Sequence, residues 1–300
     1  MIQNPSPIPL LFDTDIGSDI DDALCLAYLL KQPRCELLGI TTVTGQAADR
    51  ARLASALCMA AGRPRIPIHS GAEQPLLVPQ KQPRAPQAEV LSRWPHQRDF
   101  PPNTAVQFMR DVIRSRPGEV TLLAVGPLTN VGLLFALDPE VPRLLRGLVL
   151  MCGVFTNRLP GVGPLEWNAI GDPHATAIVY KAPTADHVSI GLDVTCRCRI
   201  PAEECRRRLR GGVLDVVADM AEVWFRGADQ ITFHDPLAGA VVYQPELCAY
   251  EEGLVDVELL SQRVAGMTHF SANAEPKPHR VATDVNSAAF FEHYFQVMQG

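Results

Sequence analysis

Five aspartates lie within ten residues near the start of this chain, from Asp13 to Asp22. The run stands between an apolar stretch, Ile8–Phe12, and a helix-like one, Ala23–Leu30. Carboxylates this close repel one another and raise each other's pKa unless positive charge lies among them. Neither the run nor its two flanks contains Lys or Arg, so that charge comes from elsewhere, and a hard divalent cation such as Ca²⁺ or Mg²⁺ is the simplest source. Capping of the next helix would need only one or two aspartates, so it does not explain all five.

Short apolar runs alternate with helix-like stretches over the first two-thirds of the chain. This rhythm predicts an α/β fold with an open, mostly parallel central sheet flanked by helices on both faces. The expected strands are Ile8–Phe12, Leu37–Val43, Ile66–His69, Val120–Val125, Leu148–Met151 and Val188–Leu192. The expected helices include Ala47–Ala61, Thr104–Ser115, Leu128–Leu137 and Ala175–Tyr180. Ligands of such sheets bind beyond the carboxyl ends of the strands, where the acidic run also falls.

The last third of the chain keeps both kinds of element. Its expected helices and strands are Glu203–Arg210, Val213–Arg226, Leu254–Leu260, Arg280–Val285 and a closing helix from Asn286. The proline-rich stretch 72–102 has little periodicity and is predicted to be a long surface loop that can act as a lid over the site. We find no internal repeat and no linker, so residues 1–300 are predicted to form a single domain.

Charge and hydropathy narrow the choice of partners. The net charge of −6 argues against a nucleic-acid-binding surface. No apolar stretch approaches the length of a membrane span, and the N-terminal residues lack a signal-peptide pattern. The eight cysteines fit free thiols in a reducing compartment. We therefore expect a cytoplasmic protein, with neither nucleic acid nor a membrane as its partner.

Two later segments place polar groups where they can meet a ligand. A buried strand stops at Val125, just before Gly-Pro, which leaves the Val125 carbonyl without an assured partner. Glu166 and Asn168 flank a tryptophan, and alternation along an extended segment puts both on one side. An acceptor beside an amide that both donates and accepts suits the recognition of hydroxyl groups.

A third segment, His234-Asp235-Pro236, begins an apolar helix. Asp235 can simply cap that helix, with Pro at its first turn. The neighbouring His234 can hold or pass a proton near neutral pH. Taken alone, the segment supports a capping interpretation and a functional one equally.

Together and in this order, the segments resemble the nucleoside hydrolases of the inosine–uridine type, which are calcium-dependent N-ribohydrolases on an open α/β sheet. The resemblance covers nearly the whole chain. It rests on the DTD…DDA signature at Asp13–Ala23, Thr41-Thr42-Val43-Thr44-Gly45, Val125-Gly126-Pro127-Leu128-Thr129-Asn130, Met151, Glu166-Trp167-Asn168 and His234-Asp235-Pro236. It implies hydrolysis of ribonucleosides to free base and ribose in purine or pyrimidine salvage, by a homo-oligomer that is a dimer or tetramer.

The resemblance also implies a role for each matching residue. Ca²⁺ would be bound by Asp15, Asp22, the Val125 carbonyl and Asp235, together with the ribose 2′- and 3′-hydroxyls and one water. Asp13 would brace the loop from behind. The catalytic residues would be Asp15, Asp21 and His234, the last near the departing base. The substrate-binding residues would be Asp21, Gln46, Met151, Asn157, Glu166, Asn168 and His234.

The chain departs from the family pattern in the acidic loop. The family usually has one residue between the glycine and the Asp-Asp pair, whereas Ser18-Asp19-Ile20 makes three here. We align the pair with Asp21-Asp22 and keep Asp19 as an alternative metal ligand or base.

Other departures concern the substrate. Gln46 stands where the family usually has Asn, and Asn157 is the only nearby substitute for an Asn expected at Pro160. The His-Gly motif of pyrimidine-preferring members has no counterpart. The choice between purine and pyrimidine therefore stays open, and so does a ribosyl substrate that is not a nucleoside.

Two alternatives belong to other classes. A Mg²⁺-dependent phosphohydrolase of the haloacid-dehalogenase type also begins with Asp-x-Asp after a strand, but Gly17 stands where that family has Thr or Val. The other is a non-catalytic ribosyl-binding protein on the same fold, suggested by Gln46 and the missing Asn.

Overall fold

The computed structural model describes residues 6–156 and 158–299, so Asn157 lies outside the described residues. Within these ranges the strands of the main sheet are β1 (Ile8–Thr14), β2 (Cys35–Thr42), β3 (Ile68–Ser70), β4 (Thr121–Ala124), β5 (Gly147–Met151), β6 (His187–Ile190), β9 (Cys248–Val257), β10 (Thr268–Ser271) and β11 (His279–Val285). Their spatial order is β10-β9-β11-β6-β5-β4-β1-β2-β3. Strand β9 is antiparallel to both of its neighbours, and the other pairs are parallel.

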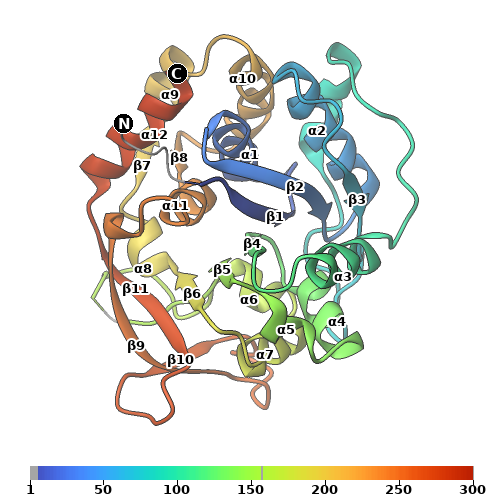
Figure 1. Cartoon of the computed structure of the whole chain (residues 1–300). Helices are drawn as coiled ribbons and strands as arrows, with labels where there is room; N and C mark the ends of the chain where they lie inside the picture. The colour runs from blue at the N-terminus through green and yellow to red at the C-terminus, as the bar shows by residue number, and fades with distance from the viewer. Residues whose placement is uncertain (1–5, 157, 300) are drawn as a thin grey trace.

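Helices cover both faces of this sheet (Figure 1). One face packs against α1 (Asp21–Lys31), α2 (Ala47–Ala60), α10 (Val213–Trp224), α11 (His234–Val241) and α12 (Ser287–Gln299). The other packs against α3 (Ala105–Ser115), α4 (Thr129–Leu137), α5 (Val141–Leu144) and α7 (Pro173–Lys181). Side chains alternate along β1, since Leu10 and Phe12 enter the first core and Leu11 the second. The predicted fold class is confirmed.

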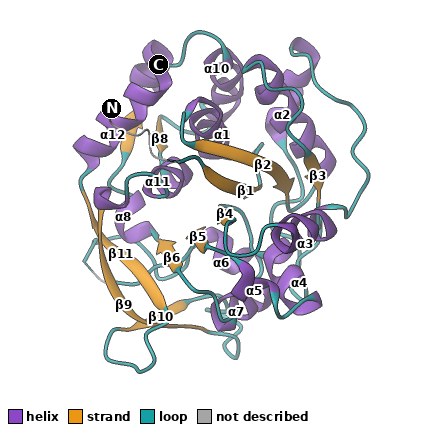
Figure 2. Ribbon diagram, viewed as in Figure 1, coloured by secondary structure: helices purple, strands orange, loops and turns teal. Residues whose placement is uncertain are grey.

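Shorter elements complete the described part of the chain (Figure 2). They are η1 (Pro86–Arg93), α6 (Trp167–Gly171), α8 (Leu192–Thr195), α9 (Ala202–Arg208), η2 (Pro245–Leu247) and a separate pair of strands, β7 (Arg199–Pro201) and β8 (Gln230–Thr232). The sequence analysis did not predict α6, α8, β7 or β8, because three to five residues are too few to show a periodic pattern.

The parallel strands agree with the predicted ones to within a few residues, whereas β9 does not. We expected a strand at Leu254–Leu260, but β9 runs from Cys248 to Val257. Exposed and buried residues mix along β9 because it is antiparallel and partly faces solvent. Its apolar residues alone therefore did not mark its start. Among the described helices, none is both long enough and apolar enough to cross a membrane.

The registers of the central strands bring their carboxyl ends to one edge of the sheet. Asp13 on β1 pairs with Thr41 on β2 and with Ala124 on β4. Leu150 on β5 pairs with Ala124. The loops that follow β1, β4 and β5 therefore leave the sheet side by side, at the edge where open α/β sheets bind ligands.

Candidate active site

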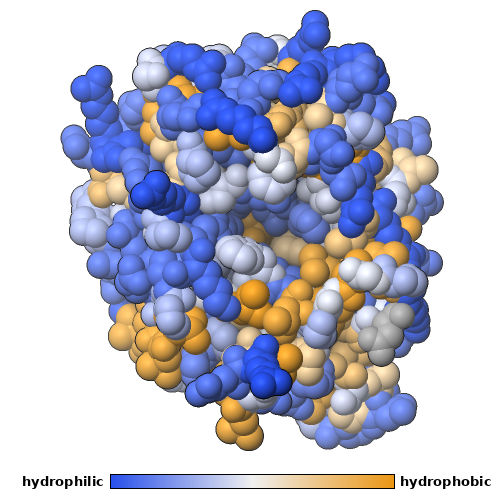
Figure 3. All heavy atoms as spheres, turned by 180° about the vertical axis from the view of Figure 1, so that it is seen from behind, coloured by the Kyte–Doolittle hydropathy of each residue, from blue (hydrophilic) through white to orange (hydrophobic). Residues whose placement is uncertain are grey.

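A pocket of about 560 Å³ lies where these strands end, a size typical of small-molecule sites. In residues 6–156 and 158–299 its lining includes six carboxylates and no Lys or Arg. The six are Asp15, Asp19, Asp21, Asp22, Glu166 and Asp235. Apolar side chains such as Met151, Leu192 and Trp224 form other parts of the wall. Viewed from behind, the molecular surface is hollowed near its middle, with hydrophobic side chains along part of the rim (Figure 3).

Three of the carboxylates are close enough to share a metal ion. Asp21, Asp22 and Asp235 each offer an oxygen, and these oxygens lie within 4.8 Å of one another. Burial and mutual repulsion raise the pKa of all three well above the ordinary value. Thr14 donates its hydroxyl to Asp22, and the Asp235 main-chain N–H donates to Asp21. Negative charge is therefore concentrated at this point, and few hydrogen-bond donors stabilise it.

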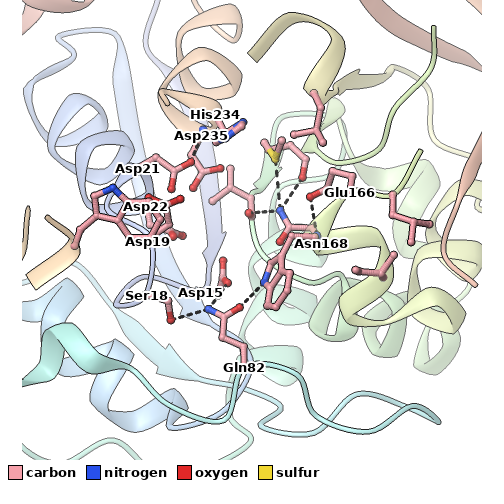
Figure 4. Close-up of a pocket in the computed structure, with 17 residues that line it drawn as sticks. Asp15, Ser18, Asp19, Asp21, Asp22, Gln82, Glu166, Asn168, His234 and Asp235 are labelled. Carbon is pink, nitrogen blue, oxygen red and sulfur yellow. Dashed lines mark hydrogen bonds between the residues drawn. The ribbon is translucent and has the colours of Figure 1, made fainter. Parts of the chain in front are cut away.

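Asp235 does not cap its helix. Helix α11 begins at His234 with Phe233 at the capping position, and no side chain accepts a capping hydrogen bond there. The Asp235 carboxylate instead lies beside Asp21 and Asp22 of α1, on the side of the pocket opposite Glu166 and Asn168 (Figure 4). Of the two interpretations left open by the sequence, the structure favours the functional one.

Asp15 lines the same pocket but does not belong to the mutually close set. Its Oδ2 accepts a hydrogen bond from Gln82 Nε2 at 2.9 Å. Burial raises the pKa of Asp15, although the charge of Arg50 opposes the shift. Asp19, which the sequence could not place, also lines the pocket, and burial raises its pKa to about 6. One Asp19 oxygen accepts from the Ile20 main-chain N–H at 2.6 Å.

Asp13 sits behind the pocket, fully buried in β1. Its Oδ1 accepts from the Thr41 hydroxyl at 2.5 Å and from Asn130 Nδ2 at 2.8 Å, which joins β1 to β2 and α4. Its Oδ2 has no partner within the described part of the chain. Burial raises the pKa of Asp13 to about 7.

Sequence reasoning missed Arg50, whose side chain is fully buried. Its guanidinium donates to four main-chain oxygens and one hydroxyl, those of Asp15, Ile16, Gly45, Arg84 and Ser18. Burial lowers the pKa of Arg50, and Asp15 and Asp22 act against that shift. The signal was present, because Arg50 stands three residues after Ala47 and four before Ala54 on the buried face of α2.

Asn168 joins the ends of two strands. Its Nδ2 donates to the Val125 carbonyl at 2.6 Å and to the Met151 carbonyl at 3.0 Å. Among the described residues the Val125 carbonyl therefore has one partner, which leaves its second lone pair available. Both Asn168 and Met151 line the pocket, as predicted for substrate-binding residues, though their contact with substrate stays a prediction.

Glu166 is buried at the start of α6 and serves as its cap. The carboxylate accepts main-chain N–H groups from Gly153, Asn168 and Ala169 at 2.6 to 3.0 Å. Residues 166–168 begin a helix rather than form the extended segment that we expected. Glu166 and Asn168 still reach the same pocket, because the helix begins at its wall.

His234 lines the pocket at the start of α11. Its Nδ1 lies 2.7 Å from the Thr195 hydroxyl. Burial lowers the pKa of His234 to about 4, and the charge of Arg199 adds to the shift. The imidazole is therefore neutral at neutral pH.

Gln46 is the predicted substrate contact that the structure places elsewhere. It does not line the pocket among the described residues. Its Oε1 accepts from the Ala85 main-chain N–H at 2.7 Å, and its Nε2 donates to Asp49 at 3.1 Å. These bonds hold the side chain against the loop at residue 85, and a contact between Gln46 and substrate stays a prediction.

A family model described as "Inosine-uridine preferring nucleoside hydrolase" matches residues 10–292. The chain belongs to this family. A nucleoside hydrolase is a hydrolase that acts on N-glycosyl bonds of ribonucleosides, and the predicted enzyme class is confirmed. The haloacid-dehalogenase alternative is excluded by this membership.

Curated relatives cover most of this nucleoside hydrolase. Uridine nucleosidase 1 of Arabidopsis thaliana is 31% identical over 265 residues, which is 83% of this chain and 78% of the relative. Pyrimidine-specific ribonucleoside hydrolase RihA of Klebsiella pneumoniae subsp. pneumoniae is 31% identical over 310 residues, 95% of this chain and 96% of the relative. The structure of a purine-preferring ribonucleoside hydrolase from Gardnerella vaginalis shares the fold, with a TM-score of 0.84 and 24% identity. The match covers 97% of this chain and 98% of the other.

Proposed function

We propose that this nucleoside hydrolase cleaves uncharged ribonucleosides with the help of one Ca²⁺ ion. The observation that carries the proposal is the lining of the pocket, which in the described residues holds six carboxylates and no Lys or Arg. Arg50 supplies a single positive charge behind them. A divalent cation would offset much of the remaining repulsion.

The donor chemistry fits a hard cation. Asp22 and Asp235, with Asp15 and the Val125 carbonyl nearby, are the groups that would hold the ion. All are oxygen donors, and Ca²⁺ takes six to eight oxygen ligands. When bound, the ion would orient the sugar hydroxyls and a water and would lower the pKa of that water.

The protein's own groups have distinct tasks in this reaction. Water adds its oxygen to the anomeric carbon while the N-glycosidic bond breaks, and the transition state resembles an oxocarbenium ion. Asp21, or alternatively Asp15 or Asp19, takes the proton that the water releases. The carboxylates around the sugar stabilise its developing positive charge.

The leaving base departs with the bonding electrons, and the proton that balances its charge comes through solvent from the water that the carboxylate deprotonated. His234 is neutral because of its lowered pKa, so an imidazole N–H donates a hydrogen bond to the base rather than carrying a full charge. Glu166 and Asn168 hold the ribose from the opposite wall, where Asn168 Oδ1 has no hydrogen-bond partner among the residues described.

Uridine is the first substrate to test, because the relatives at 31% identity carry names for uridine or pyrimidine ribonucleosides. Inosine belongs beside it, since the structural neighbour from Gardnerella vaginalis is named as purine-preferring. The homo-oligomeric state, the single domain and a role in nucleoside salvage remain predictions, and light scattering after gel filtration tests the first.

The decisive experiment is a panel of uridine, cytidine, inosine and adenosine, assayed after removal of metal and again with Ca²⁺ or Mg²⁺ added. We expect release of free base that a chelator abolishes and Ca²⁺ restores. Restoration by Mg²⁺ alone would overturn the choice of ion. No cleavage of any nucleoside with Ca²⁺ present would support the non-catalytic binding alternative instead.

A further inference from the structure

A segment of the predicted lid loop, residues 72–87, contributes Gln82 to the lining of the pocket, and we call it the strap. On one side it is tied to the wall that contains α6 and α7, through Leu76 N to Asp172 Oδ2 at 2.8 Å and Lys81 Nζ to the Ile170 carbonyl at 2.9 Å. On the other side it is tied to the acidic loop, through Ser18 Oγ to the Arg84 carbonyl at 3.2 Å and Gln87 N to the Gly17 carbonyl at 3.0 Å.

Gln82 lies in the middle of the strap and points into the pocket (Figure 4). Its Nε2 donates to Asp15 Oδ2 at 2.9 Å and to Ser18 Oγ at 2.7 Å. Its Oε1 accepts from the indole N–H of Trp167 at 2.6 Å. All three partners therefore meet on one amide.

The orientation of this amide follows from its partners. An ionised carboxylate only accepts hydrogen bonds, and an indole N–H only donates. A flipped amide would place its oxygen against Asp15 and its NH₂ against the Trp167 N–H, and both contacts would be repulsive. The donor side of Gln82 is thus committed to the acidic loop and its acceptor side to α6.

The Asp15 carboxylate is turned by this bond. Its Oδ2 faces Gln82, and its Oδ1 lies against the end of β4, where a Cβ added to Gly126 would come within 2.8 Å of it. Asp15 is 6% exposed and has five other carboxylates around the same pocket. A fixed donor on one oxygen leaves the other directed to the strand end that carries Val125.

We propose that Gln82 is a positioning residue that orients Asp15 and couples it to Trp167, so that the metal-binding wall and the ribose-binding wall keep one geometry. This inference rests on the proposed function. It also gives a role to the extended acidic loop, because Ser18, one of the three residues between Gly17 and the Asp-Asp pair, accepts the second N–H of Gln82. Partners of metal-binding groups typically change metal affinity or activity by about 10- to 100-fold when removed.

The test compares variants of the full chain. Gln82→Met keeps the length of the side chain and removes its hydrogen bonds, whereas Gln82→Glu keeps its shape and places a carboxylate against Asp15. Trp167→Phe keeps one aromatic ring but removes the indole N–H bonded to Gln82 together with the rest of the five-membered ring. Gln74→Met is the matched control, because Gln74 is an exposed glutamine on the same strap.

Two readouts separate positioning from a purely structural role. Calorimetric titration with Ca²⁺, without nucleoside, measures metal affinity, and steady-state kinetics separate kcat from KM. For Gln82→Met we expect about a 10-fold loss of Ca²⁺ affinity and about a 10- to 100-fold loss of kcat, with a smaller change in KM. The losses of Ca²⁺ affinity and kcat should be larger for Gln82→Glu and smaller for Trp167→Phe. Gln74→Met should match the parent in both.

Thermal melting shows whether each variant is folded. If Gln82→Met is not folded, Trp167→Phe tests the role of Gln82 in its place. Ca²⁺ affinity and kcat both within twofold of the parent in every folded variant would overturn the role of Gln82 while leaving the proposed function intact. Weakened Ca²⁺ binding in the variants of a parent that cleaves no nucleoside would support Gln82 and overturn the proposed function. A parent that neither binds Ca²⁺ nor cleaves would overturn both.

Discussion

The guanidinium of Arg50 donates to the main-chain oxygen of Asp15, not to its carboxylate. Arg50 is thereby an anchor for the backbone of the acidic loop as well as a source of positive charge. It also reaches the Arg84 carbonyl of the strap at 2.9 Å. One buried cation thus connects the loop that carries the aspartates with the strap.

Replacing Arg50 should destabilise the protein. Arg50→Met leaves buried carbonyl oxygens without donors and removes the positive charge near Asp15 and Asp22, so we expect a loss of about 3 kcal/mol or more in the free energy of unfolding. Arg52→Met is the matched control on the same helix, where a partly exposed ion pair with Asp49 is lost. The control should lose less than about 1 kcal/mol. Urea denaturation measures both values, and equal losses would contradict the anchoring role.

Removing one carboxylate of the close set should have opposite effects with and without metal. Asp235→Asn relieves repulsion among Asp21, Asp22 and Asp235, so the metal-free variant should melt at a higher temperature than the metal-free parent. Saturating Ca²⁺ should raise the melting temperature of the parent by several degrees and leave the variant nearly unchanged. An equal Ca²⁺-induced shift in both proteins would exclude Asp235 as a ligand.

A phosphate on the substrate should prevent cleavage. The pocket lining contains no Lys or Arg in the described ranges, so the charge of a 5′-nucleotide meets only carboxylates and any bound cation. We expect kcat/KM for uridine 5′-monophosphate to be at least ~100-fold lower than for uridine, which corresponds to about 3 kcal/mol. Comparable values for the two compounds would show that a cationic group reaches the site.

A buried pair of histidines outside the pocket lining should contribute less to stability in mild acid than at neutral pH. The His187 ring stacks on Tyr180. It also contacts the His279 ring edge to face, with 4.7 Å between the two ring centroids. Burial lowers the pKa of both histidines below the ordinary value of 6.5. At these two sites the unfolded chain therefore binds more protons than the folded one below about pH 6.5, and their contribution to stability is lost as the pH falls through that value.

His187→Phe should reduce this acid sensitivity. Neither ring nitrogen of His187 has a hydrogen-bond partner among the described residues, so phenylalanine removes an unsatisfied polar group and should add about 1 kcal/mol at pH 7. The gain over the parent should grow between pH 7 and pH 5, because the variant lacks one of the two titrating groups. Melting temperatures across this range measure it, and parallel curves for the two proteins would contradict the assignment.

Much of the fold follows from local patterns. The buried parallel strands appear in the sequence as apolar runs near their actual positions, because a strand covered on both faces needs apolar residues throughout. The boundaries of β9 could not be found in this way, since its exposed side is polar. The start of α6 was misread as extended because five residues do not reveal a helical period.

Part of the candidate site could likewise be predicted from local sequence, and part depended on tertiary packing. The aspartates of the run between Asp13 and Asp22 are adjacent in sequence, and charge repulsion alone marked them as unusual. Whether Asp235 caps a helix or faces those carboxylates depended on how α11 packs beside α1. Gln46 has a polar side chain suited to a substrate, but among the described residues it does not line the pocket, and its Oε1 accepts from the Ala85 main-chain N–H.

The sequence by itself therefore determined the class of fold, the enzyme family and the presence of a concentrated negative charge, because each depends on residue types and on short spacings along the chain. Only the tertiary structure decided which groups meet that charge. Arg50 and Gln82 lie 35 and 67 residues from Asp15. No local periodicity relates residues so far apart, and their hydrogen bonds form only when the core brings the helix and the strap to the end of the sheet.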